Sequence, residues 1–149
     1  MTTFKPIRVL GRGASGQTIM VRRSGDGALF AMKEIAKQRA SQSVERRRVM
    51  TERRVLHSCC SPFIVRLHYA FQTHSALYLV IDLCAGGDLH AHLQRCGRFE
   101  AERSRFYAAE LTLAIDHLHR ADVLHRDLKP ENVLLDAMGH VRLVDFGLR

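Results

Sequence analysis

HRDLKPEN occupies residues 125–132 of this chain, and DFG follows at residues 145–147. The two stretches bring a carboxylate (Asp127), an ammonium group (Lys129), an amide (Asn132) and a second carboxylate (Asp145) into 21 consecutive residues. A carboxylate can orient a hydroxyl group, an ammonium group offsets phosphate charge, and amide and carboxylate oxygens are ligands that Mg²⁺ prefers. The pattern therefore indicates chemistry on a phosphate group assisted by a divalent cation.

The composition is that of a globular protein. The 149 residues suit one domain, and 46% hydrophobic with 26% charged residues excludes a disordered chain. No apolar run approaches the roughly 18 residues of a membrane span, and the N-terminus lacks the apolar core of a secretory signal. The four cysteines show no metal-ligand spacing, so we expect reduced thiols. These features favour a cytoplasmic location, with the nucleus as an alternative.

The net charge of +8 raises the question of nucleic-acid binding. Single-stranded nucleic acids are bound by basic grooves lined with stacking aromatic side chains. Aromatic residues make up only 7% of this chain, and none lies among the arginines of its most basic segment, Arg46, Arg47, Arg48, Arg53 and Arg54. We therefore expect no nucleic-acid partner, and favour a solvated basic face or a docking surface for an acidic segment.

The apolar pattern changes part-way along the chain, which predicts an α+β fold. Alternation and short apolar runs predict five strands, at residues 7–10, 18–22, 29–35, 65–71 and 77–83, with one helix at 44–57 capped by Ser43. A helical pattern follows, with a short helix from Leu89 that ends at Gly97 and a long one over 101–121. The long helix has a predicted core stripe formed by Tyr107, Leu111, Ala114, Ile115 and Leu118. Two short strands, 133–135 and 141–144, flank a turn at 136–139.

The glycine motif GRGASG at residues 11–16 has two interpretations. A dinucleotide site would require a helix after the glycines, whereas QTIMV at 17–21 predicts a strand. The glycines then lie in a hairpin, either a plain structural turn or one whose backbone N–H groups cover a triphosphate. In the next predicted strand, Lys33 stands among apolar residues, where a charge requires a partner. Glu52 is the predicted partner, and an exposed role for Glu52 is the alternative.

The order and spacing of these motifs resemble those of eukaryotic protein kinases. The segments YAFQTH (69–74), AGGDLHAHL (85–93) and RFYAAEL (105–111) are similar to the basophilic serine/threonine group that includes cyclic-nucleotide-dependent kinases and protein kinase B. The resemblance covers about residues 4–149. It implies a five-stranded antiparallel N-lobe with one helix at about 1–84, a hinge at 85–88, and the first part of a mainly helical C-lobe at 89–149.

The resemblance also implies roles for individual residues. Asp127 is the expected catalytic base and Lys129 the γ-phosphate contact, while Lys33, held by Glu52, binds the α- and β-phosphates. Asn132 and Asp145 are the expected Mg²⁺ ligands, and His125 a structural residue of the loop. The remaining ATP contacts surround the adenine, ribose and phosphates: Leu10, Gly11, Gly13, Gly16, Thr18, Ala31, Ile81, Asp82, Cys84, Asp88 and Leu134.

Two departures from the family pattern affect the nucleotide site. Ser15 stands where an aromatic residue often caps the glycine loop, and Thr18 replaces the usual valine. No counterpart of the activation segment follows residues 145–147, so we expect a kinase catalytic domain truncated at that point. Its expected function is transfer of the ATP γ-phosphate to serine or threonine of a protein substrate, with a basic substrate as one candidate. The alternative is an inactive ATP-binding fragment or a decoy for kinase partners, and the sequence does not indicate an oligomeric state.

Overall fold

The computed structural model describes residues 3–13, 16–37, 52–53, 56 and 60–146. These residues form two compact units, the first comprising Met1–Arg53 and Leu67–Leu83, the second Arg54–Arg66 and Cys84–Arg149. Most of the predicted helix at 44–57, with its cap, lies outside the described residues, as does Ser15. Glu52, Arg53 and Leu56 are helical.

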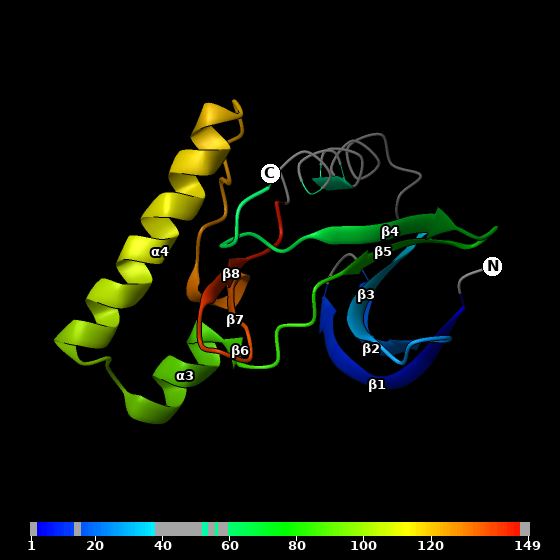
Figure 1. Ribbon diagram of the computed structural model, residues 1–149, viewed down its shortest axis with the longest axis horizontal. Coiled ribbons are helices and arrows are strands. Elements are labelled where there is room, and N and C mark those ends of the chain that lie inside the picture. The colour runs from blue at the N-terminus through cyan, green and yellow to red at the C-terminus, as the bar shows by residue number, and fades with distance from the viewer. Residues whose placement is uncertain (1–2, 14–15, 38–51, 54–55, 57–59, 147–149) are drawn as a thin grey trace. The chain divides into compact units, whose positions relative to one another are not determined.

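The first unit is a five-stranded antiparallel sheet in the order β1-β2-β3-β5-β4. β1 and β2 form a curved hairpin (Figure 1). The strands span Phe4–Gly13 (β1), Gly16–Arg23 (β2), Leu29–Ala36 (β3), Leu67–Gln72 (β4) and Ala76–Ile81 (β5). The sheet confirms the five predicted strands, and the glycine motif lies in the β1–β2 hairpin as expected.

One face of this sheet carries the larger apolar cluster of the unit. Val21, Phe30 and Val80 are buried in it, with Phe4 and Tyr69 packed against them. The three buried residues come from three neighbouring strands, and residues directly opposite each other in an antiparallel sheet share a face. The alternation along β2, β3 and β5 therefore leaves the opposite face for other residues.

The second unit contains a small sheet in the order β6-β7-β8 together with helices α3 and α4 (Figure 1). Its elements are β6 (Gly87–Asp88), α3 (Leu89–Cys96), α4 (Ala101–Arg120), the 3₁₀ turn η1 (Pro130–Asn132), β7 (Val133–Leu135) and β8 (Val141–Leu143). β6 and η1 were not predicted from the sequence. Among the described residues, no helix is long and apolar enough to cross a membrane.

Local chemistry explains the limits of the two helices. The Asp88 carboxylate accepts from the Ala91 backbone N–H at 2.7 Å and so caps the start of α3. Gly97 ends that helix with φ 73°, a left-handed conformation that favours glycine, and its N–H donates to the Leu93 carbonyl. At the end of α4, Asp122 takes φ 56°, and the chain leaves the helix there.

The predicted strand at 65–71 begins two residues later than expected. Val65 is buried, but its N–H donates to the carbonyl of Leu143 in β8, at 3.2 Å, and Ile64 forms a parallel bridge to the same residue. Val65 therefore belongs to the second unit, whereas β4 from Leu67 onward belongs to the first. The alternation of Val65 with Leu67, Tyr69 and Phe71 therefore joined residues of two units into one predicted strand.

Candidate active site

Four residues expected to line the nucleotide site share one face of the first sheet. Thr18 lies opposite Lys33, and Ala31 lies opposite Ile81, two residues further along the same strand. Because side chains alternate along a strand and directly opposite residues share a face, all four point to the same side. Ala31 is buried and the other three are half-buried. This face is the one opposite the Val21, Phe30 and Val80 cluster.

Lys33 and Glu52 form the predicted ion pair. The Lys33 ammonium group donates to both Glu52 carboxylate oxygens, at 2.8 and 3.1 Å. Glu52 is only 7% exposed, so the exposed alternative for this residue is wrong. Because a buried carboxylate is costly without a cation, the pair fixes the position of both side chains.

Two glycines of the glycine motif have different surroundings. A Cβ built at Gly16 would lie 1.9 Å from the Glu34 carbonyl oxygen, so the close approach of β3 requires glycine there. At Gly11 no described heavy atom lies within 4 Å of such a Cβ. Packing therefore explains Gly16, whereas at Gly11 the fold leaves open space above the strand. Gly13 ends β1, and Leu10 is partly exposed.

The loop at residues 125–132 gathers its polar groups around Asp127. Lys129 Nζ donates to Asp127 Oδ2 at 2.8 Å. Asn132 Nδ2 donates to the Asp127 carbonyl at 2.8 Å and to Oδ2 at 3.2 Å. Asn132 itself is buried by the η1 turn, which Pro130 begins. A proline-started turn therefore brings residues five apart into contact around one carboxylate.

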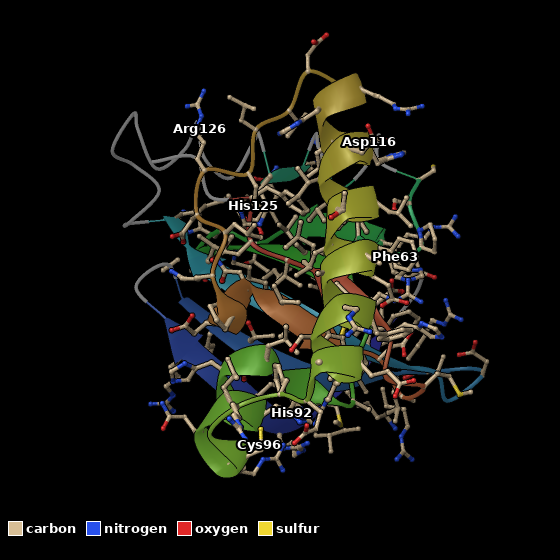
Figure 2. The ribbon with its side chains drawn as sticks, turned by 90° about the vertical axis from the view of Figure 1, so that its left-hand side faces the viewer. Phe63, His92, Cys96, Asp116, His125 and Arg126 are labelled. Carbon is tan, nitrogen blue, oxygen red and sulfur yellow. The ribbon has the colours of Figure 1, made fainter. Side chains whose placement is uncertain are left out.

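His125 holds this loop against the end of β8. Its buried ring bonds through Nε2 to the Val144 carbonyl at 3.0 Å, and Nδ1 accepts from the Asp127 N–H at 3.4 Å. The ring of Phe146 packs on it edge to face at 5.3 Å. Both nitrogens therefore serve the fold, which confirms the predicted structural role, whereas the neighbouring Arg126 is exposed (Figure 2).

Asn132 and Asp145 fit the requirements of a magnesium site. Val144 N–H donates to the Asn132 carbonyl at 3.0 Å, so the residue before Asp145 is bonded to Asn132. Asp145 has φ 61°, a strained conformation for a residue other than glycine. Mg²⁺ is commonly held by one or two protein oxygens together with substrate phosphates, which is the set that an amide and a carboxylate provide. Among the described residues no group of three His, Cys, Asp or Glu side chains offers a fuller metal site.

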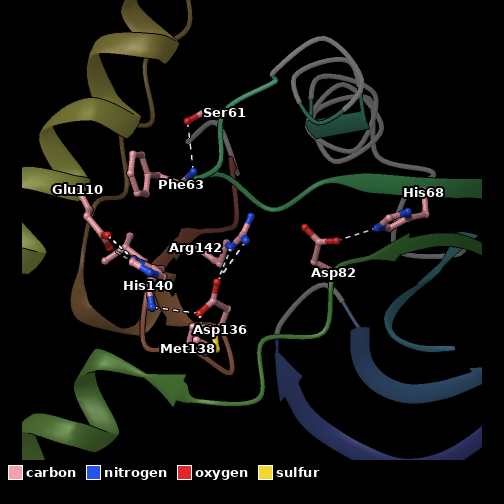
Figure 3. Close-up of polar contacts among 10 residues, drawn as sticks. Ser61, Phe63, His68, Asp82, Glu110, Asp136, Met138, His140 and Arg142 are labelled. Carbon is pink, nitrogen blue, oxygen red and sulfur yellow. Dashed lines mark hydrogen bonds and ion pairs between the residues drawn. The ribbon is translucent and has the colours of Figure 1, made fainter.

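The remaining predicted nucleotide contacts are distributed over both units. In the second unit Asp88 of β6 lies directly opposite Leu134 of β7, and Cys84 is half-buried. One Asp88 oxygen is already used as the cap of α3. In the first unit the Asp82 carboxylate bonds His68 Nε2 at 2.7 Å (Figure 3).

A buried carboxylate that the sequence interpretation missed lies on α4. Glu110 is 7% exposed, accepts from the Val141 N–H at 2.8 Å, and bonds His140 Nδ1 at 2.6 Å (Figure 3). It joins Tyr107, Ala114 and Leu118 as a buried position of the helix, whereas the predicted Leu111 and Ile115 are only half-buried. Its place three residues after Tyr107 was the available signal, but an acidic residue is rarely assigned to a core.

The turn between β7 and β8 links the ionisable residues Asp136, His140 and Arg142 to Glu110 by hydrogen bonds. The hydrogen bond and the negative charge of Glu110 raise the pKa of His140. Burial by itself raises the pKa of Asp136, but hydrogen bonds from the His140 and Met138 N–H groups and from Arg142 outweigh it, and the pKa is lowered. Asp136 is therefore a carboxylate that closes the turn, and Glu110 anchors the turn to α4.

Comparison with known proteins decides the family. A model of the protein kinase domain matches residues 4–149. The chain belongs to the protein kinase domain family. It is 47% identical to the serine/threonine-protein kinase Sgk2 of Homo sapiens, over 99% of this chain and 40% of the relative. It is 48% identical to the serine/threonine-protein kinase SCH9 of Candida albicans, over 97% of this chain and 19% of the relative.

Protein kinase 2 of Dictyostelium discoideum is 45% identical, over 97% of this chain and 30% of its own length. This kinase-family chain therefore spans well under half the length of these relatives. The match confirms the family and the fold class expected from HRDLKPEN and DFG. It also agrees with the five-stranded antiparallel sheet and the two helices described above.

Proposed function

We propose that this chain is the catalytic part of a serine/threonine protein kinase, transferring the γ-phosphate of ATP to a protein hydroxyl group. The observation that carries the proposal is the arrangement around Asp127, where Lys129 and Asn132 both donate to one carboxylate oxygen. A carboxylate held in a fixed orientation can direct an attacking hydroxyl group. The Lys129 ammonium group, 2.8 Å from the same carboxylate, would offset the charge of a phosphate brought to that hydroxyl group.

In this proposal Asp127 orients the substrate hydroxyl and takes its proton. Lys129 then offsets charge on the γ-phosphate, which is the stabilisation that phosphoryl transfer depends on. Asn132 has a second function, because its amide nitrogen positions Asp127 while its amide oxygen can bind a cation. His125 fixes the loop through its two ring nitrogens.

Two residues would hold Mg²⁺, namely Asn132 through its amide oxygen and Asp145 through its carboxylate. Bound magnesium supplies positive charge that offsets the phosphates during transfer. The Val144–Asn132 backbone bond supports this assignment because it ties the segment carrying Asp145 to the loop carrying Asn132. The strained backbone at Asp145 supports it further, since such conformations are concentrated at functional sites.

In the first unit, residues on one face of the five-stranded sheet would contact ATP. The Lys33 ammonium group binds the α- and β-phosphates, and Glu52 holds it in position. Thr18, Ala31 and Ile81 offer the adenine a face bounded by β2, β3 and β5. Open space at Gly11 leaves room for the phosphates beside the ends of β1 and β2 that carry Leu10, Gly11, Gly13 and Gly16.

The second unit would contribute the other nucleotide contacts. Leu134 packs against the adenine, and Asp88, directly opposite it in the β6–β7 pair, reaches the ribose hydroxyl groups through its second oxygen. A backbone group of Cys84 would meet the adenine edge, as would one of Asp82, which belongs to the first unit. The lobe limits expected from the sequence, with a hinge at 85–88, remain part of this proposal.

The acceptor is a serine or threonine in a protein segment, and we propose that it lies in a basic sequence. Lys129, two residues after Asp127, resembles the serine/threonine type, and the relatives Sgk2 and SCH9 are named serine/threonine kinases. Glu131, within the loop at residues 125–132, is half exposed and lies 3.6 Å from His90 Nδ1, and its carboxylate can attract a basic side chain. We place the protein in the cytoplasm or the nucleus.

A chimera tests the proposal. Residues 1–149 would replace the aligned 148 residues of human Sgk2, and phosphate transfer to serine peptides with arginine or glutamate flanks would be measured. We expect turnover that favours the basic peptide. Asp127→Ala should lower kcat by about 100- to 10,000-fold, the range for loss of a general base, and leave ATP affinity almost unchanged. Retention of most of the kcat would refute the role of Asp127, and binding of ATP without any transfer would favour the inactive fragment.

A further inference from the structure

Two arginines converge on one histidine nitrogen where α3 meets α4. Arg95 Nη2 lies 3.2 Å from His92 Nδ1, and Arg103 Nη2 lies 3.3 Å from the same atom. His92 and Cys96 mark this place on α3 (Figure 2). All of these residues belong to the second unit, and none takes part in the phosphate-transfer chemistry proposed above.

The hydrogen bonds of His92 determine which nitrogen carries its proton. Nδ1 faces two guanidinium groups, which only donate, so it must accept. Nε2 therefore carries the proton and donates to the Gly86 carbonyl at 2.8 Å. Gly86 is itself held tightly, because a Cβ there would lie 2.8 Å from the Asp136 carbonyl oxygen. The imidazole thus presents a fixed acceptor atom to both guanidinium groups.

Both guanidinium groups are oriented in advance by the fold. Arg103 donates through Nε to the Tyr107 hydroxyl at 3.0 Å, and its charge lies 4.6 Å from the Phe99 ring centre. Arg95 donates through Nε to the Ala91 carbonyl at 3.3 Å. Side chains held this way lose little conformational freedom when they bind a ligand.

Arg95 and Arg103 differ from those arginines of the chain that pair with a carboxylate. Three described arginines do form such ion pairs: Arg23 with Asp26, Arg120 with Asp116, and Arg142 with Asp136. Within the described part of the chain, neither Arg95 nor Arg103 pairs with a carboxylate, and no acceptor contacts the Nη1 of either group. One neutral lone pair is a weak counterpart for two cations.

We propose that Arg95, Arg103 and His92 form a binding site for a phosphate monoester. Planar guanidinium groups recognise phosphate oxygens by paired, charge-assisted hydrogen bonds. Two groups that already meet at one atom can donate their remaining N–H groups to one phosphate. The ligand is either a phosphorylated protein side chain or a free small phosphate, since both present the same group. The site is separate from the proposed ATP contacts and does not depend on the proposed kinase activity.

The test is a residue-specific titration of the 149-residue chain by NMR. The Nε–H signals of Arg95 and Arg103 and the ring signals of His92 would be followed as inorganic phosphate, or a phosphoserine peptide, is added at constant ionic strength. Sodium chloride and the unphosphorylated peptide are the controls. The titration is repeated with the Lys33→Met variant, so that phosphate bound at the proposed nucleotide site does not contribute to the shifts. We expect saturable shifts of all three residues with the phosphorylated ligands only.

Variants then distinguish a phosphate-binding site from arginine contacts that only stabilise the fold. Arg95→Gln, at an exposed side chain, should weaken phosphate binding about tenfold or more, as loss of a charge-assisted hydrogen bond does. Arg105→Gln, at an exposed arginine of α4, is the matched control for general charge and should change little. Tighter binding of the phosphopeptide than of inorganic phosphate identifies a protein ligand, and equal binding identifies a small one. Absence of saturation, or equal losses in the two variants, would overturn the proposal.

Discussion

Glu110→Ala should destabilise the second unit more than any change at the partner side chain His140. The wild-type carboxylate is 7% exposed and accepts from the N–H of Val141, a residue that is 0% exposed. Alanine removes that acceptor and leaves a buried amide unpaired, which costs about 1–3 kcal/mol. The void left by the carboxylate adds to this cost. For a chain of this size each kcal/mol lowers the melting temperature by about 2–4 °C.

The assay is urea unfolding followed by circular dichroism, together with hydrogen exchange at the Val141 amide. Glu110→Gln is the matched variant, because its amide oxygen can still accept from Val141, and it should be less destabilising. His140→Ala removes a half-exposed partner and leaves the Val141 bond intact. We therefore expect the loss of stability to be largest for Glu110→Ala, smaller for Glu110→Gln and smallest for His140→Ala. Equal effects of Glu110→Ala and His140→Ala, or unchanged exchange at Val141, would refute the reasoning.

Three further predictions concern pH, the glycine motif and ATP. Because Glu110 raises the pKa of His140, the stability that this pair contributes should be full below the ordinary histidine pKa and lost as pH rises through the raised value. The free energy of unfolding of the wild type and of Glu110→Gln would be measured from about pH 5 to 9. The difference between the two free energies should shrink as pH rises through the histidine range, and a difference that stays constant contradicts the prediction. Gly16→Ala should cost about 1–3 kcal/mol of stability, whereas Gly11→Ala should keep the melting temperature and weaken ATP binding, and the reverse pattern would reject both assignments. Lys33→Met should weaken Mg-ATP affinity in calorimetry, and unchanged affinity would exclude its role as phosphate ligand.

The sequence by itself determined those features that depend on neighbouring residues. HRDLKPEN and DFG identified the family, alternation and short apolar runs found all five strands of the first sheet, and Gly97 marked the end of α3. Such signals are local, because a turn, a cap or a periodicity is specified within a few residues. The Lys33–Glu52 pair was also predicted, since a lysine among apolar strand residues requires a partner.

Only the tertiary structure decided which distant groups meet. The predicted core stripe of α4 did not include Glu110, and periodicity could not show that the N–H of Val141 and the ring of His140 would satisfy a carboxylate there. Nor could it show that Arg95 and Arg103, on different helices, share one nitrogen of His92. Hydrogen-bond partners far apart in sequence depend on how elements pack. The packing of the elements selects one set of distant contacts from the many that the local sequence patterns would allow.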